Sequence, residues 1–464
     1  GANDLNGSVS IVAGGDISLT GDGSGAMIGH GASAGDATGT RTGGLNIYTD
    51  GSISLTDGST GASLISHQTA DGPGSVNYAG GTNGGDSGYS IVGLSGVNLD
   101  PTLRQQTGVG AAGTLITLAE TIGAALTLGD VTIASGGTSS LTIGSGSLPD
   151  VAFNSANQLS LLSGGDLTLL IGFQNSGSGG LGLLAGWANT GTTAATAPVM
   201  TGTYNASNPA LGNISLPNFA PISITGVVAA TEFGANNGIV RIGDGTQESG
   251  VSVGSKTGVT EVLGSGITVA GGATDGSYAQ LGFYGDNSGA ITGALNLSAS
   301  SGGISVDAGA GENSFAQIGH GGGTSAGGDV IADISIRQLQ PGGLGITGSS
   351  GQSAYAQIGH GGAGYTGIMV GSITPVGSFS RAIFAAGSGN GASAQFGHGG
   401  VDAGGDKQGD VSLSAGTIIM GGGVGDAAFA QIGHGGTNGG GSVSGSLNVA
   451  ATAGAIEMVS GVVG

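Results

Sequence analysis

Phe429-Ala430-Gln431-Ile432-Gly433-His434-Gly435-Gly436 is the last of several closely similar segments in the C-terminal half of the chain. Near copies occupy residues 393–400, 355–362 and 315–322, and the copy at residues 278–283 has phenylalanine in place of the histidine. The last motif residues of these copies lie 37, 40, 38 and 36 residues apart (320 − 283, 360 − 320, 398 − 360 and 434 − 398). A nearly constant period is typical of a protein whose repeats stack as similar units, with length variation placed in loops.

Weaker copies of the segment occur nearer the N-terminus. Residues 25–30 and 62–67 end in histidine, and residues 239–244 end in aspartate, 39 residues before Phe283 (283 − 244). With these copies included, every histidine of the chain occupies one position of the repeat. We expect the six histidines to form a structural ladder of neutral imidazoles that hydrogen-bond at one corner of the stack: His30, His67, His320, His360, His398 and His434.

The alternation of side chains within each repeat predicts β-strands. Val411, Leu413 and Ala415 alternate with Ser412 and Ser414, which is the period of two of a half-buried strand. Glycine, Asp and Asn end such runs, as expected at turns. The sequence therefore predicts an all-β, elongated parallel β-helix, or β-solenoid, with roughly 38-residue repeats and three short strands per repeat, at residues 410–416, 417–421 and 429–434 in the last full one. Two shorter rungs per repeat remain an alternative.

The composition excludes several classes of protein. Glycine makes up 108 of 464 residues, but nine prolines and the absence of a three-residue period argue against collagen. A hydrophobic content of 38% with only 8% charged residues argues against a disordered chain. The net charge of −21 and the scattered basic residues make nucleic acid an unlikely partner. The chain has no cysteine, no apolar run of the ~18 residues that a membrane span needs and no signal-peptide pattern, so we expect no membrane insertion.

The repeat pattern varies along the chain, and we expect five segments. Residues 181–221 hold the single tryptophan and little alternation, so they are expected to form a projecting loop whose Trp187 and Tyr204 are possible contact residues. The segments are residues 1–70 with the His30 and His67 motifs, an irregular excursion at residues 71–112, degenerate rungs at residues 113–180, the projecting loop at residues 181–221 and regular repeats at residues 222–464.

Strand units such as residues 409–420, with Ser and Thr between aliphatic residues, resemble the repeat regions of filamentous haemagglutinin-like adhesins of Gram-negative bacteria. The lack of cysteine and the scarcity of lysine add to this resemblance, which covers the chain apart from about residues 68–112 and 181–221. Such proteins use two-partner or autotransporter-type secretion. The resemblance implies a right-handed parallel β-helix, a location outside the cell or on its surface, and a role in attachment rather than catalysis.

These observations predict a secreted structural and adhesive β-solenoid that forms a surface stalk or filament. The expected partners are further copies of the chain, joined end to end or laterally, and a carbohydrate or protein receptor on a host or matrix. A first alternative is a carbohydrate-active enzyme on a β-helix, although Asp150, Asp166, Glu232, Asp244, Glu261 and Asp307 stand apart in the sequence and suggest no catalytic pair. A second is a metal- or pH-responsive histidine ladder.

The glutamines of the motif also occupy one position in successive copies: Gln280, Gln317, Gln357, Gln395 and Gln431. If they face inward, each amide can donate to one neighbouring rung and accept from the other. Alternation within 429–433 instead favours the aromatic and glutamine columns as an exposed stripe or a contact between filaments. No cofactor is expected, and the acidic turns at residues 285–287 and 404–406 lack the nonapeptide repeat of calcium-binding solenoids.

Overall fold

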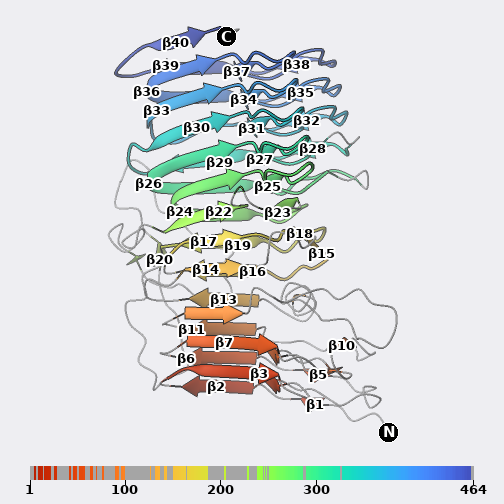
Figure 1. Ribbon diagram of the computed structural model, residues 1–464, viewed down its shortest axis with the longest axis vertical. Helices are drawn as coiled ribbons and strands as arrows, with labels where there is room; N and C mark the ends of the chain where they lie inside the picture. The colour runs from red at the N-terminus through yellow and green to blue at the C-terminus, as the bar shows by residue number, and fades with distance from the viewer. Residues whose placement is uncertain are drawn as a thin grey trace.

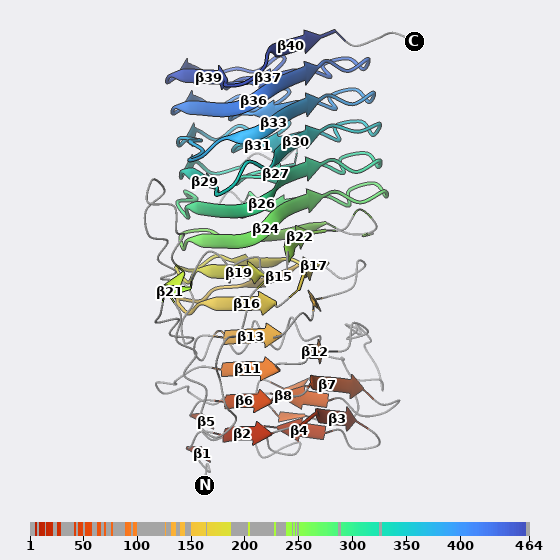
Figure 2. The same cartoon turned by 90° about the vertical axis from the view of Figure 1, so that its left-hand side faces the viewer.

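The computed structural model describes residues 150–163, 165–186, 238–243, 251–285, 289–323 and 327–460, together with separate strands and single residues elsewhere. Every element whose bounds are described is a β-strand. The strands stack one above another along the long axis of the molecule, from the N-terminus at one end to the C-terminus at the other (Figures 1 and 2). We call each level of this stack a layer. The prediction of an all-β fold built from parallel sheets is confirmed.

The largest sheet has two columns of parallel strands. The first contains β2 (Val9–Ala13), β6 (Leu45–Thr49), β11 (Tyr89–Gly93), β13 (Val131–Ser135), β16 (Leu159–Ser163), β19 (Leu181–Ala185), β29 (Ile334–Gln338) and β39 (Leu447–Ala451). The second contains β14 (Leu141–Ile143), β17 (Leu167–Leu169), β22 (Ile239–Ile242), β30 (Gly343–Thr347), β33 (Phe379–Ala385) and β40 (Ile456–Val459). Three long strands run through both columns: β24 (Thr260–Ala270), β26 (Leu295–Asp307) and β36 (Val411–Gly421).

A third column holds the repeated motif. Its eight-stranded sheet contains β15 (Val151–Phe153), β18 (Phe173–Asn175), β23 (Val251–Ser255), β25 (Ala279–Leu281), β27 (Ala316–Ile318), β31 (Ala356–Ile358), β34 (Ala394–Phe396) and β37 (Ala430–Ile432). Beyond it, four short strands form a separate parallel sheet at the side of the stack: β28 (Val330–Ile331), β32 (Met369–Val370), β35 (Lys407–Gln408) and β38 (Val443–Ser444). We call this sheet and its connections the side lobe.

Smaller sheets account for the remaining strands. β3 (Ile17–Gly21), β7 (Ser52–Asp57) and β12 (Gly96–Leu99) form one parallel sheet, and β4 (Ala26–Ile28) and β8 (Ser63–Ile65) form another. Two more parallel pairs are β1 (Leu5–Asn6) with β5 (Arg41–Thr42) and β20 (Thr203–Tyr204) with β21 (Val227–Val228). The pair β9 (Thr69–Ala70) and β10 (Val76–Asn77) is antiparallel.

Equivalent residues of successive motif copies lie directly opposite one another. Gln280 pairs with Gln317, Gln317 with Gln357, and the same register continues to Gln395 and Gln431. Parallel in-register pairing brings identical side chains together at about 4.8 Å, the ordinary spacing between strands. The sequence period therefore becomes a set of columns of like residues that run along the stack.

Burial follows the predicted alternation in the first half of β36 but not in the motif strand β27. Along β36, Val411, Leu413 and Ala415 are buried and the serines between them are partly exposed. In β27, Ala316, Gln317 and Ile318 are all buried. Ala316 and Ile318 belong to the main apolar core, so the glutamine faces the opposite side and is covered there as well.

The prediction of an exposed aromatic and glutamine stripe is therefore wrong. The glycine-rich chain that follows each histidine folds back over this face. An added side chain at Gly322 would meet the Gln317 amide, and one at Gly362 would meet the Tyr355 hydroxyl. Phe315, Tyr355 and Ala363 form a small buried cluster beneath this cover. Alternation within one strand could not reveal it, because the cover comes from residues later in the repeat.

Three further expectations differ from the structure. Residues 239–242 pair with Gly266–Val269 of β24 and belong to the second column, whereas Val251–Val253 of β23 pairs with the motif strand β25. The strands expected at residues 410–416 and 417–421 form one strand, β36. Residues 181–185, expected as the start of the projecting loop, form the buried strand β19, which pairs with β16 and β24.

Candidate functional site

Four of the predicted histidines stack in one column. The imidazole rings of His320, His360, His398 and His434 have centroid separations of 5.2, 4.7 and 4.7 Å and are nearly parallel. The first three side chains are fully buried, and His434 is partly exposed. The structure thus brings these four together, while His30 and His67 lie outside the residues that it describes.

Each ring in the column uses both nitrogens. Nδ1 of His360 accepts a hydrogen bond from the backbone N–H of His320 at 3.0 Å, and Nε2 donates to the carbonyl oxygen of Ala332 at 2.8 Å. The same pair of bonds recurs at the other three histidines. Because a backbone amide can only donate, Nδ1 must be unprotonated, and the proton must lie on Nε2. The geometry therefore selects one neutral tautomer and ties each layer to the previous one.

Burial depresses the pKa of these imidazoles. Desolvation lowers the pKa of His320 to about 4 and that of His398 to about 3. For His360, desolvation and then the neighbouring imidazoles lower the pKa well below its usual value. The pKa of the half-buried His434 is also lowered, chiefly by desolvation. The rings are therefore neutral at pH 7, and their nitrogens are engaged by the backbone rather than available to a metal ion.

The column is interrupted at Phe283, and the structure supplies a replacement that the sequence did not suggest. The preceding layer would present the amide of Ser255 to a histidine at position 283. This amide instead donates to the Thr260 hydroxyl at 3.2 Å. Phe283 packs in the side lobe with Tyr365 and Met369. A buried amide needs an acceptor, and a hydroxyl from the next strand serves in place of an imidazole.

The motif glutamines bond mainly to backbone. Nε2 of Gln357 donates to the carbonyl oxygens of Gly397 and Gly399 in the next layer, both at 2.8 Å. Gln280, Gln317 and Gln395 bond to equivalent glycines. Within the column, a contact between two amides occurs from Gln317 to Gln357 at 3.3 Å. Gln431 bonds to the carbonyl oxygen of His434 in its own layer. The glutamines thus satisfy carbonyls at the glycine-rich corner.

Aromatic side chains stack beside the glutamines. Tyr278 lies between Tyr284 and Phe315, with ring centroids 5.0 and 4.8 Å away, and Phe315 stacks on Tyr355 at 5.0 Å. We call the histidine, glutamine and aromatic columns together the motif column. Its side chains bond to the backbone and to one another.

The remaining candidate residues do not form a common site. Asp166 pairs with Arg241 at 3.1 Å, and the carboxylate of Asp307 accepts a hydrogen bond from Ser305. Burial raises the pKa of Asp150 and of Glu261 to about 7, and each has one buried carboxylate oxygen without a hydrogen-bond partner. Trp187, Glu232 and Asp244 lie outside the described residues; Tyr204 lies in β20, but its side chain is not described. Within the described ranges, no group of three or more metal-ligating side chains is placed to hold a metal ion.

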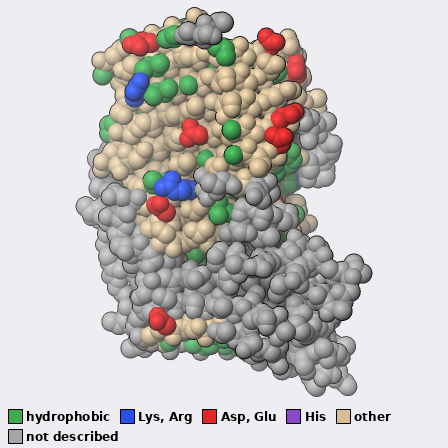
Figure 3. All heavy atoms as spheres, in the orientation of Figure 1, with side chains coloured by type: hydrophobic (Ala, Val, Ile, Leu, Met, Phe, Trp, Pro, Cys, Tyr) green, Lys and Arg blue, Asp and Glu red, His purple; other side chains and the backbone are tan. Residues whose placement is uncertain are grey.

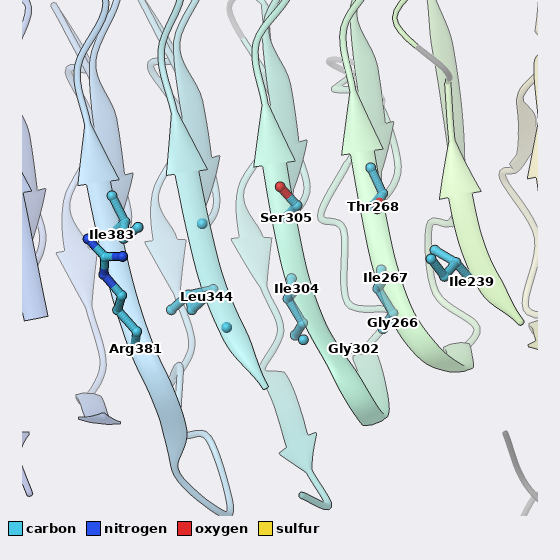
Figure 4. Close-up of a pocket in the computed structure, with 13 residues that line it drawn as sticks. Ile239, Gly266, Ile267, Thr268, Gly302, Ile304, Ser305, Leu344, Arg381 and Ile383 are labelled. Atoms are coloured by element: carbon cyan, nitrogen blue, oxygen red, sulfur yellow. The ribbon is translucent and has the colours of Figure 1, made fainter. Parts of the chain in front are cut away.

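A depression of about 280 Å³ lies on the outer face of the second strand column, and sequence reasoning missed it. Its floor is a row of equivalent positions on five successive strands, occupied by Ile239, Gly266, Gly303, Gly343 and Arg381. Figure 4 shows Ile239 and Arg381 on the strands at the two ends, with Thr268 and Ser305 on strands between them. We call this depression the glycine trough. No repeated motif marks it, because the middle of its floor is formed by three glycines, Gly266, Gly303 and Gly343, which have no side chain.

The next outward-facing row lies beside this floor. It consists of Arg241, Thr268, Ser305, Gly345 and Ile383, of which all but Arg241 line the trough. Arg241 is held by Asp166, whereas the exposed Arg381 forms no ion pair with a described residue. On the face drawn in Figure 3, basic side chains are few and stand apart from one another. The trough thus offers two hydroxyl groups, the apolar Ile239 at one end, and at the other end an arginine that is unpaired among the described residues.

Comparisons with known proteins place the chain in no family. No family model, no curated protein and no solved structure matches it. In the part of the chain that the structure describes, no helix is long and apolar enough to cross a membrane.

Proposed function

We propose that this chain is part of a secreted, elongated protein with a mechanical and adhesive role, exposed as a stalk or filament at a bacterial cell surface. In this proposal it is a right-handed parallel β-helix in which each repeat of roughly 38 residues adds one layer. The resemblance of its strand units to filamentous haemagglutinin-like adhesins motivates the location, the handedness and the role in attachment.

The observation that carries the proposal is the motif column. Equivalent histidines and glutamines lie opposite one another in successive layers, and all of them except Gln431 bond to the backbone of an adjacent layer. Such bonds recur at each interface between the layers from β25 to β37, so one architecture is repeated along this part of the stack. A body of this kind is stiff along its axis and has few free strand edges along its sides.

The surface composition agrees with an extracellular rod. Seven basic residues in 464 leave few cleavage sites for trypsin-like proteases, and the absence of cysteine avoids dependence on disulfides. We propose that its partners are further copies of the chain, joined end to end or laterally, and a carbohydrate or protein receptor on a host or matrix.

Electron microscopy of the native protein and attachment assays test the proposal together. We expect long, thin particles, and we expect deletion of the protein to reduce attachment of the producing cells to a surface. A compact globular particle, or unchanged attachment after deletion, would contradict the proposed role.

A further inference from the structure

The floor of the glycine trough contains one glycine that the fold does not require. An added Cβ at Gly343 would meet no atom within 4 Å, and its φ lies outside the region that favours glycine. Gly303, in the same row, has φ +82°, and an added Cβ would lie 2.0 Å from the carbonyl oxygen of Gly343. Packing therefore explains Gly303 but leaves Gly343 without a structural reason. The absence of a side chain at position 343 keeps the floor open next to Arg381.

The trough has the dimensions of a site for an extended ligand. Its ends, Ile239 and Arg381, are four strand spacings apart, or about 19 Å at 4.8 Å per strand. The floor strands are already paired on both sides, so a peptide cannot bind by adding a strand. Nucleic acid is excluded by the single unpaired cation and by the net charge of −21. A ligand must instead lie across the outer face and bond to side chains.

The polar groups of the trough fit a hydroxylated chain that carries a carboxylate. Ser305 donates its proton to Asp307, which leaves its oxygen free to accept from a ligand hydroxyl, and Thr268 adds a second hydroxyl one layer away. Arg381 at the end of the floor is exposed and unpaired among the described residues, so its guanidinium can bind a carboxylate through two parallel hydrogen bonds. Ile239 and Ile383 offer apolar contact to the faces of sugar rings.

We propose that the glycine trough binds acidic polysaccharide, with Arg381 holding a uronate carboxylate and Ser305 and Thr268 bonding to ring hydroxyls. This inference rests on the adhesive role proposed above and names its receptor class. Binding through one arginine is weak for a single site. Many copies along a filament raise the overall avidity, because each further contact is effectively intramolecular.

The test measures binding of short oligogalacturonates to the purified chain by isothermal titration calorimetry. The matched ligand is the methyl-esterified form, which keeps the hydroxyls but lacks the charge. We expect esterification to weaken binding about tenfold or more, because a hydrogen-bonded charge is lost. The Arg381→Gln variant should weaken binding of the acidic form by a similar factor and leave binding of the ester nearly unchanged.

A second variant closes the trough without touching Arg381. Gly343→Leu places a side chain over the open floor and should abolish binding of both ligands while the melting temperature stays close to that of the wild type. Gly404→Leu is its control, because an added Cβ there meets only Thr366, at 3.9 Å, and the site is in the side lobe. Gly404→Leu should bind as the wild type does.

The outcomes separate this inference from the adhesive role. The trough is not a site for acidic glycans if the wild-type chain does not bind oligogalacturonate or binds its methyl ester equally well. The same conclusion follows if the Arg381→Gln and Gly343→Leu variants bind oligogalacturonate as tightly as the wild type does. Long particles and surface attachment would still support the adhesive role in that case. Compact particles without attachment would overturn the adhesive role even if the trough binds uronates.

Discussion

The motif column and the glycine trough use glycine and polar side chains in opposite ways. In the motif column, Gly359 has φ +154°, and an added Cβ would lie 1.9 Å from the carbonyl oxygen of Gly397. In the trough, Gly343 meets nothing. The polar side chains of the motif column are bound to the backbone, whereas Arg381 of the trough is unpaired among the described residues. The comparison teaches that repetition in this chain marks packing between layers, and that departures from repetition mark the surface.

The largest expected difference is in acid, which should destabilise the motif column more than the strands of the glycine trough. The folded-state pKa of His320 is about 4 and that of His398 about 3, below the ordinary 6.5, so the fold favours the neutral rings. For these two rings the stabilisation is fully present above pH 6.5 and is lost as the pH falls toward the folded values, on the order of 3–5 kcal/mol for each. We expect the amide protection factors of the motif strands to fall below pH 6 before those of the strands of the trough do.

Two buried carboxyls act in the opposite direction and must be removed for a clean measurement. The raised pKa values of Asp150 and Glu261 favour the fold at low pH. The experiment therefore uses the Asp150→Asn, Glu261→Gln background. Equal acid sensitivity of both regions in this background would show that the histidines do not control stability.

Substitution of matched glycines should have the next largest effect. Gly359→Ala forces a Cβ into the backbone of the adjacent layer at a positive φ and should cost about 3 kcal/mol. Gly343→Ala should change the free energy of unfolding by less than about 0.5 kcal/mol. Thermal melting followed by circular dichroism, with amide exchange of β31 and β34, measures both. Similar losses from the two variants would remove the distinction between packing glycines and surface glycines.

Removal of one imidazole tests the bonds between layers. His360→Ala leaves the His320 amide and the Ala332 carbonyl without partners and should cost about 2–3 kcal/mol. His434→Ala, at a half-buried ring, should cost less, because water can replace the lost bonds. Thr268→Ala in the trough is the surface control. Amide exchange near each site gives the local free energies, and an equal effect at His360 and Thr268 would contradict a structural role for the column.

The last prediction concerns the charge of Asp150. Burial raises the pKa of this carboxyl to about 7, so its charge is costly in the folded state at higher pH. Asp150→Asn should stabilise the protein more at pH 8 than at pH 5, by about 2–3 kcal/mol, because the wild-type carboxyl is ionised in the fold at pH 8 and protonated there at pH 5. Thermal melting at the two pH values checks this sign. Destabilisation at pH 8 would show that a partner holds the charged form.

Much of the fold can be predicted from the spacing of the motif and the alternation of apolar residues. The period of 36 to 40 residues indicates stacked units, and the pattern around Val411, Leu413 and Ala415 identifies a strand with one buried face. The pairing of Gln317 with Gln357 follows from the same period. By contrast, residues 239–242 resemble the motif but pair in another column, because so short a run of mainly apolar residues fits a strand of either column.

The candidate site was much less predictable. The repetition of the histidines suggested a site, but their ring nitrogens form hydrogen bonds with backbone groups. The spacing of the histidines cannot show these bonds. Thr260 compensates for the histidine missing at position 283 although it lies 23 residues before that position in the chain (283 − 260). The glycine trough joins residues from Ile239 to Ile383 that share no motif.

The strand content and the columns of like residues follow from the amino-acid sequence, because local alternation marks strands and the repeated motif places equivalent residues in register. The tertiary structure decided what those columns face. Gln357 is buried because residues after His360 fold over it, and Gly343 is open because no neighbouring segment approaches it. Both facts depend on contacts between layers and on the return of the chain, which no single repeat contains.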